Sequence, residues 1–196
     1  MTVAMNFHET QETPLMSLGT PCFSTRNDRQ FRKDFRRLAL LANCFCMAPY
    51  RQFTDPDTCG RFAECLYLAE SPSDYQSAQI GCRAENATLP DVFSAAKEHF
   101  LERNAVTEGH FPFWIGLNNM KNNDYLEWDS GDLFSTRVYS DFPQGWRLRN
   151  GDVCVAAVQA PHTQMVSWDQ QGCDFDGPTN YYYCQKTACD ASNYCN

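Results

Sequence analysis

The residues best suited to form a binding surface lie in a long, weakly patterned stretch, residues 132–152. Trp146 stands there close to Gln144, Arg147 and Arg149. An aromatic face flanked by planar amide and guanidinium donors suits stacking on a sugar ring or an interface hot spot with a protein partner. A connection of this length is more typical of a functional loop than of a routine link between elements. The alternative is that Trp146 folds back into a small core within the loop.

Bond-breaking chemistry is not indicated by the sequence. The chain contains no Ser/His/Asp arrangement, phosphate-binding loop, zinc-protease helix or Cys pair with zinc-finger spacing. Asp174 and Asp176, followed by Gly177, hint at a cation loop, but the closing glutamate of an EF-hand is missing, so a turn is favoured. His99 stands alone in a predicted helix and is interpreted as structural or surface. We therefore predict that the protein is not an enzyme.

The formal net charge of -8 is unevenly divided along the chain. Residues 1–52 carry seven Lys and Arg against four Asp and Glu, a net of +3, whereas residues 53–196 carry nine against twenty, a net of -11. A body this acidic argues against nucleic acid as a partner, because phosphates require a basic footprint. No apolar stretch is long enough to span a bilayer, so no membrane span is expected.

The first 52 residues are predicted to form a disordered extension. Within it, a basic segment leads into an apolar run that ends at Cys46-Met47-Ala48, the layout of a secretory signal peptide. We interpret residues 29–48 as such a signal, although it begins well inside the chain. The alternative is a short amphipathic helix that precedes the domain.

Eleven cysteines point to disulfides in an oxidising, extracellular setting. Removal of Cys22, Cys44 and Cys46 with the signal segment leaves eight, an even number that suits a disulfide framework. In a secreted chain, Asn86-Ala87-Thr88 is an N-glycosylation acceptor, so we predict a glycan on Asn86.

The elements that position these residues are two helices and several short strands. The first helix is predicted from Ser71 to about Glu85 and the second from about Val92 to Arg103. In the second helix the residues expected to face inward are Phe93, Ala96, Phe100 and Leu101, and those expected to face outward are Lys97, Glu98, Glu102 and Arg103. Short strands are predicted at residues 65–69, 125–128, 154–158, 165–168 and 181–184.

An unbroken apolar run from Phe111 to Leu117 predicts a strand that is buried on both faces. Trp114 and Trp128 are expected to be large core anchors, and Gly116 is expected to let another segment pack close to the backbone.

Trp114-Ile115-Gly116-Leu117, followed by Trp128 and Gly131, resembles the WIGL…W…G core signature of the C-type lectin-like domain. Further matches follow in the family's order: Tyr75-x-x-Ala78-x-x-x-Cys82, Leu89, Cys154-Val155, Trp168, Cys173 and Tyr183-Cys184. The resemblance covers about Cys59 to Gln185. It implies an α+β fold of two helices, small antiparallel sheets and a long loop. We place this domain at residues 53–188, followed by a disulfide-clipped tail at 189–196.

The resemblance also implies disulfides. The family pairing carries over as Cys82 with Cys184 and Cys154 with Cys173. Cys59 and Cys65 would then close an N-terminal hairpin, and Cys189 would pair with Cys195. The sequence leaves open that Cys59 or Cys65 reaches the tail pair instead.

Sugar-binding members of the family bridge the sugar through a calcium ion, which takes oxygen ligands. The resemblance puts Asp152 and the triplet Trp168-Asp169-Gln170 at ligand positions, but the usual loop triplet is missing. Arg147 and Arg149 place positive charge where the cation would sit. We therefore predict a secreted module that binds a glycan or an extracellular protein without a cofactor. The predicted ligand-binding residues are Gln144, Trp146, Arg147, Arg149, Asn150, Asp152, Asp169 and Gln170. The alternative is a calcium-dependent lectin with a degenerate site formed by Asp152, Asp169 and Gln170.

Overall fold

The computed structural model describes residues 4–6, 24–26, 46–55, 60–136, 139–160 and 165–189. The elements in chain order are β1 (Ala4–Asn6), β2 (Ser24–Arg26), β3 (Arg51–Asp55), β4 (Gly60–Leu68), α2 (Tyr75–Ala84), α3 (Ala95–Glu108), β5 (Phe113–Asn118), β6 (Glu127–Trp128), the 3-10 helix η2 (Phe134–Thr136), β7 (Cys154–Gln159), β8 (Val166–Gln171) and β9 (Tyr181–Thr187). β1 and β2 pair in parallel, and the other strands form one seven-stranded sheet.

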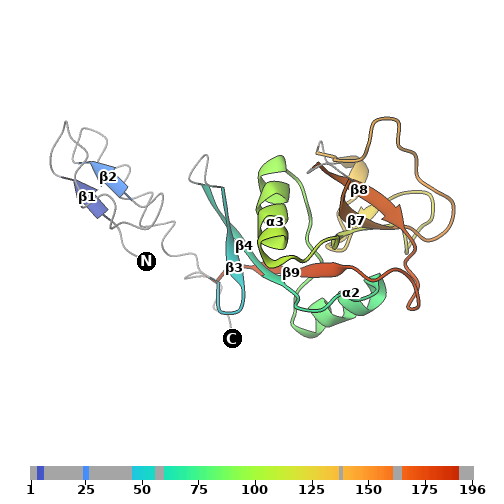
Figure 1. Ribbon diagram of the computed structural model, residues 1–196, viewed down its shortest axis with the longest axis horizontal. Helices are drawn as coiled ribbons and strands as arrows, with labels where there is room; N and C mark the ends of the chain where they lie inside the picture. Colours follow the sequence, from blue (N-terminus) through green and yellow to red (C-terminus); the bar gives the residue numbers. More distant parts are fainter. Residues whose placement is uncertain are drawn as a thin grey trace.

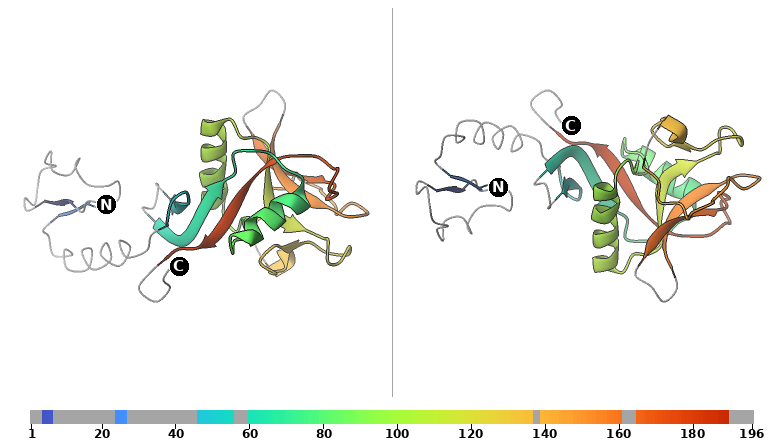
Figure 2. Two further views of the ribbon diagram at one scale, coloured as in Figure 1. Left: turned by 90° about the horizontal axis from the view of Figure 1, so that it is seen from below. Right: turned by 90° about the horizontal axis from the view of Figure 1, so that it is seen from above.

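The large sheet runs in the order β3-β4-β9-β5-β7-β8, and β6 pairs with β5. Its β5-β9 pair is parallel, whereas the other pairs are antiparallel. Helix α3 stands beside the β3-β4 hairpin and α2 lies along β9, while β7 and β8 occupy the far end of the sheet (Figure 1). The views from below and above show the same division (Figure 2). The fold is therefore α+β, as expected.

The central strand β5 is buried along its whole length, which confirms the prediction from its apolar run. Trp114 and Trp128 are fully buried. A Cβ atom on Gly116 would lie 2.9 Å from the main-chain oxygen of Leu89, a distance that real side chains do not tolerate. Gly116 thus allows the segment after α2 to pack directly on the strand, and its N–H donates to the Pro90 oxygen at 2.9 Å.

Both helices start later than predicted. Helix α2 is capped by the Asp74 side chain, which accepts from the Ser77 N–H, rather than beginning at Ser71. The residue before it, Ser73, pairs in extended conformation with Asn180, and this pairing delays the helix. Helix α3 is capped by Ser94 and continues to Glu108, five residues past the expected end. Within the described part of the chain, neither helix has the length and apolar character needed to cross a bilayer.

The prediction that Lys97 and Glu98 face outward from α3 is wrong, because both are buried. Lys97 Nζ donates to Gln185 Oε1 at 2.5 Å and pairs with the Glu64 carboxylate. Glu98 accepts hydrogen bonds from two side chains that lie far along the sequence. Charged side chains can be buried when such partners satisfy them, and helical periodicity carries no information about those partners.

The disulfides agree with the family pairing at two bridges and differ at the third. Cys82 bonds to Cys184 and Cys154 to Cys173, as expected. Cys65 bonds to Cys46 rather than to Cys59, so the expected Cys59–Cys65 hairpin is wrong. Cys189 is buried and disulfide-bonded. The expected Cys189–Cys195 pair cannot be compared, because Cys195 lies outside the described residues, as does Cys59.

The Cys46–Cys65 bridge changes the interpretation of the N-terminal region. Tyr50, just before β3, is buried in the domain core, and its hydroxyl donates to Glu85 at 2.8 Å. Residues 46–50 therefore pack with the domain instead of preceding it. A signal peptide cleaved after Ala48 would remove Cys46 before it could pair, so a signal segment that ends at residue 48 is at odds with this disulfide. Residues 29–45 lie outside the described residues.

Candidate functional site

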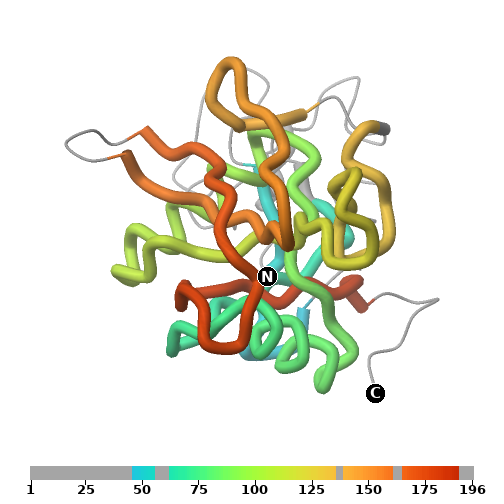
Figure 3. The backbone as a smooth tube through the Cα atoms, turned by 90° about the vertical axis from the view of Figure 1, so that its right-hand side faces the viewer, coloured from blue at the N-terminus to red at the C-terminus, as the bar shows by residue number. Residues whose placement is uncertain are grey.

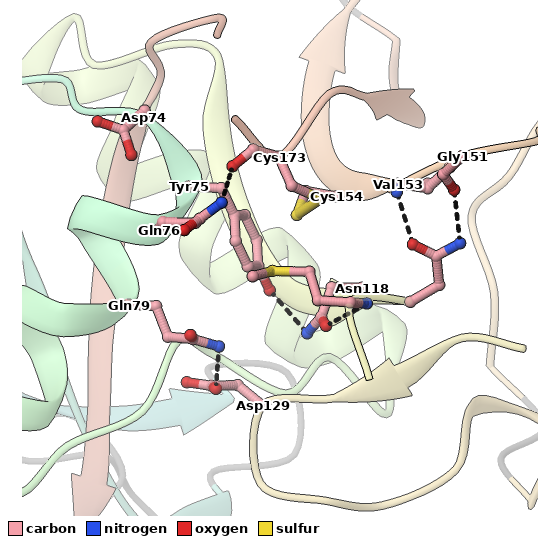
Figure 4. Close-up of a disulfide and its surroundings, with 12 residues drawn as sticks. Asp74, Tyr75, Gln76, Gln79, Asn118, Asp129, Gly151, Val153, Cys154 and Cys173 are labelled. Carbon is pink, nitrogen blue, oxygen red and sulfur yellow. Dashed lines mark hydrogen bonds between the residues drawn. A yellow bond between two sulfur atoms is a disulfide. The ribbon is translucent and has the colours of Figure 1, made fainter. Parts of the chain in front are cut away.

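The long loop at residues 139–152 projects from the end of the molecule that carries β7 and β8, as the orange arch in Figure 3 shows. Its return to the sheet is fixed at several points. Asn119 donates to the Gly151 oxygen at 2.9 Å and accepts from the Val153 N–H at 2.6 Å. The Cys154–Cys173 disulfide follows directly, and Gln76 donates to the Cys173 oxygen beside it (Figure 4). The base of the loop is therefore tied to α2 and β5.

The loop has its own aromatic core. Trp146 stacks on Phe142, with ring centroids 4.1 Å apart, and is half-buried. Phe134 lies edge-on to both rings, and Phe142 contacts Trp168 of β8 at 5.3 Å. Of the two readings of Trp146, the structure favours the one in which it folds back into the loop. Phe134 and Phe142 were not among the candidates, although the density of aromatic residues in this stretch was a usable signal.

A clamp between Gln170 and the loop holds residues 147–149. The buried Gln170 amide donates to the Arg147 main-chain oxygen at 2.8 Å and accepts from the Arg149 N–H at 2.9 Å. The Arg149 guanidinium also donates to the Gln170 main-chain oxygen at 2.7 Å. It also lies 3.6 Å from Asp169 Oδ1. Both polar atoms of the Gln170 amide are thus occupied by the loop.

These contacts do not fit a calcium ion. The ion requires six to eight oxygen ligands, but Gln170 Oε1 already accepts from Arg149, and Asp169 faces the Arg149 guanidinium. Asp152 is exposed near the end of the loop. Across the described ranges, no cluster of three or more His, Cys, Asp or Glu residues is arranged to hold a metal ion.

The structure brings together Arg149, Asp169 and Gln170, and the Arg147 main chain joins them. Apart from the half-buried Trp146, the other predicted side chains are exposed along the loop; they are Gln144, Arg147, Asn150 and Asp152. The loop therefore presents a firmly held backbone with exposed polar and cationic side chains. Such a surface can donate hydrogen bonds to a polar ligand.

One residue that sequence reasoning missed lies beneath the loop. Glu98 of α3 accepts from Trp168 Nε1 at 2.5 Å and from the hydroxyl of Tyr139, the first described residue of the loop. Burial, with a smaller contribution from Asp141, raises the pKa of Glu98 to about 7. The same burial and the hydrogen bond to Glu98 raise the pKa of Tyr139. Helical periodicity places Glu98 on the outward face of its helix, so no sequence signal points to it.

Comparison with known proteins supports the fold. Residues 71–186 match the Lectin C-type domain family model. The chain is 27% identical over 133 residues to lithostathine of Rattus norvegicus, covering 64% of this chain and 76% of that protein. It is 25% identical over 126 residues to C-type lectin domain family 4 member M of Hylobates lar, covering 64% of this chain. The match spans 29% of that relative, less than a third of its length.

Two solved structures share the fold at low identity. The SPL-1–GlcNAc complex has a TM-score of 0.59 at 14% identity, covering 74% of this chain and 96% of that chain. The C-type lectin domain of murine dendritic cell inhibitory receptor 2 in complex with N-glycan has a TM-score of 0.58 at 17% identity, covering 72% of this chain and 98% of that chain. Members of the matched family bind carbohydrate or other ligands and are generally not enzymes. With its signature strand, its two family disulfides and the match over residues 71–186, the chain belongs to the C-type lectin domain family.

Proposed function

We propose that this domain is an extracellular recognition module that binds a glycan or a protein through the loop at residues 139–152, without a bridging calcium ion. The observation that carries the proposal is the Gln170–Arg149 clamp, in which Arg149 engages the Gln170 amide oxygen and faces Asp169, two of the three candidate calcium ligands. Two solved structures with this fold are titled as complexes with GlcNAc and with N-glycan, which supports a glycan as the first ligand class to test.

The disulfides support an oxidising, extracellular location. The match covers 76% of lithostathine, so that relative is not much longer than this domain. Asn86 is exposed directly after α2, where an oligosaccharide could be attached. We therefore propose a secreted glycoprotein.

Calorimetric titration with calcium, followed by glycan-array binding with and without a chelator, tests the proposal. We expect no calcium binding heat and glycan or protein capture that the chelator does not change. Tight calcium binding together with chelator-sensitive capture would instead support the alternative, a calcium-dependent lectin that uses Asp152, Asp169 and Gln170. The variant Arg149→Gln gives a second comparison, because it removes the guanidinium that faces Asp169. Asp152 and Gln170, the other two candidate ligands, are unchanged in this variant.

A further inference from the structure

The carboxyl group of Glu98 lies where helix α3, strand β8 and the long loop meet. The residue is 2% exposed. One oxygen accepts from the Trp168 indole of β8 and the other from the Tyr139 hydroxyl at the start of the loop. A single side chain thus joins three segments that are far apart in the sequence.

The contacts continue from Glu98 to the binding surface. The Trp168 ring packs against Tyr139 at 5.9 Å and Phe142 at 5.3 Å, and Phe142 stacks on Trp146. The main-chain N–H of Trp168 also donates to the main-chain oxygen of Asp141 at 3.0 Å. Trp168 is followed directly by Asp169 and Gln170, which hold Arg149. Any shift of the indole therefore reaches both the aromatic core of the loop and the Gln170 clamp.

We infer that Glu98 is the positioning residue of the ligand loop, and that ionisation of its carboxyl group loosens the loop. The statement that this loop binds the ligand rests on the proposed function, whereas the coupling between Glu98 and the loop does not.

The direction of the pH effect on loop opening follows from the hydrogen bonds and the charge of the protonated and ionised forms of Glu98. A protonated Glu98 keeps both hydrogen bonds, because its O–H can donate to Tyr139 while its other oxygen accepts from Trp168. An ionised Glu98 also accepts from both, but it carries a charge that is cut off from water. The charged groups that face it are Asp141 from the loop and Glu102 from α3, both of its own sign. His99 acts on these two carboxyl groups in the opposite sense and lowers the pKa of each. Trp168 from β8 brings no charge. Opening of the loop would return the charged carboxylate to water.

The closed loop therefore holds the Glu98 proton more tightly than the open loop, where the pKa returns towards 4.5 from about 7. Opening becomes more favourable as the pH rises between these two values and levels off above the upper one. The effect is lost when residue 98 cannot ionise.

The test is hydrogen exchange of the loop amides in the ligand-free protein, with wild type and Glu98→Gln compared at each pH. The intrinsic exchange rate cancels in the ratio of the two proteins. Glutamine keeps an acceptor for Trp168 and can donate to the Tyr139 oxygen, so it imitates the protonated acid. We expect the ratio of wild-type to variant exchange to rise roughly 10- to 30-fold between about pH 5.5 and about pH 8. A ratio that does not change with pH would overturn the inference.

Two further variants separate positioning from general effects. Asp124→Asn removes one exposed negative charge that is not among the groups facing Glu98, and it should leave the pH profile of loop exchange close to wild type. If it reproduces the effect of Glu98→Gln, the inference is wrong, because net charge alone would explain the result. Glu98→Ala removes both hydrogen bonds and should give fast loop exchange at every pH, which Glu98→Gln does not.

A second measurement keeps the inference testable if Glu98→Gln does not fold. Carbon-13 NMR titration of the Glu98 carboxyl in the wild-type protein should give a midpoint near 7, together with shifts of the Tyr139 and Trp168 side-chain signals at the same midpoint. A midpoint near the ordinary 4.5 would contradict it. Neither experiment contains a ligand, so an empty glycan array would leave this result unaffected.

Discussion

Arg149 donates two hydrogen bonds to Gln170, one from its main chain and one from its side chain. The Gln170 amide oxygen accepts from the Arg149 N–H at 2.9 Å, and the Arg149 guanidinium donates to the Gln170 main-chain oxygen at 2.7 Å. The resemblance to the family puts Gln170 at a position that in sugar-binding members supplies a calcium ligand. The Arg149 guanidinium also lies 3.6 Å from Asp169 Oδ1, and the loop is further held by the stacking of Trp146 on Phe142 and by the Cys154–Cys173 disulfide at its base.

The first prediction concerns this arginine. Arg149→Gln should increase hydrogen exchange in the loop and lower the free energy of unfolding by about 0.5–1.5 kcal/mol, because a charge-assisted hydrogen bond and a partly exposed ion pair are lost. Urea unfolding measures the change. Arg147→Gln is the matched control, since only its main-chain oxygen takes part in the clamp. Equal destabilisation by the two variants would argue against the clamp.

The second prediction concerns Trp146. Trp146→Ala should weaken ligand capture and also lower the unfolding free energy by about 1–2 kcal/mol, because the ring stacks on Phe142 rather than standing free. Phe175→Ala is the control, since this ring is 58% exposed in the turn between β8 and β9. Lost affinity with unchanged stability would mean that Trp146 contacts the ligand without supporting the loop.

The third prediction concerns the disulfides. Mass spectrometry of a non-reduced digest should recover a peptide pair that links Cys46 to Cys65. Replacement of both residues by alanine should lower the unfolding free energy by about 3 kcal/mol, as expected for a loop of this length. Recovery of a Cys59–Cys65 pair from the folded protein would reinstate the pairing expected from the sequence.

The fourth prediction concerns Asp91, which is 5% exposed and has one carboxylate oxygen without a hydrogen-bond partner. Burial, only partly offset by Ser130 and Lys97, raises its pKa to about 6 from 3.8. The folded protein thus binds this proton more tightly than the unfolded chain, so the unfolding free energy should fall as the pH rises between these values and then level off.

Asp91→Asn should remove that slope, which amounts to about 1–3 kcal/mol. Urea unfolding across this pH range measures it, with the exposed Asp124→Asn as control. A wild-type curve whose stability rises with pH in this window would show that Asp91 is better stabilised as a charge than its burial indicates.

The sequence by itself determined the fold and the location of the long loop. The apolar run Phe113–Leu117 could only be a strand buried on both faces, and Gly116 marked a close approach of the backbone. The face of α2 that includes Ala78 and Cys82 was also predictable, because helical periodicity reports which side is apolar. These features are local, so residue type and spacing are enough to reveal them.

Only the tertiary structure decided what lies around the charged and sulfur-containing groups. Glu98 follows a pattern that predicts exposure, but Tyr139 and Trp168 reach it from segments 41 and 70 residues away and satisfy its oxygens. Cys65 pairs with Cys46 because β3 folds back along β4, although Cys59 is closer to Cys65 in the chain. Arg149 turns towards Gln170 for a similar reason, since the β7–β8 pairing carries that amide to the base of the loop. Partners of this kind are set by distance in space, and a single sequence does not record them.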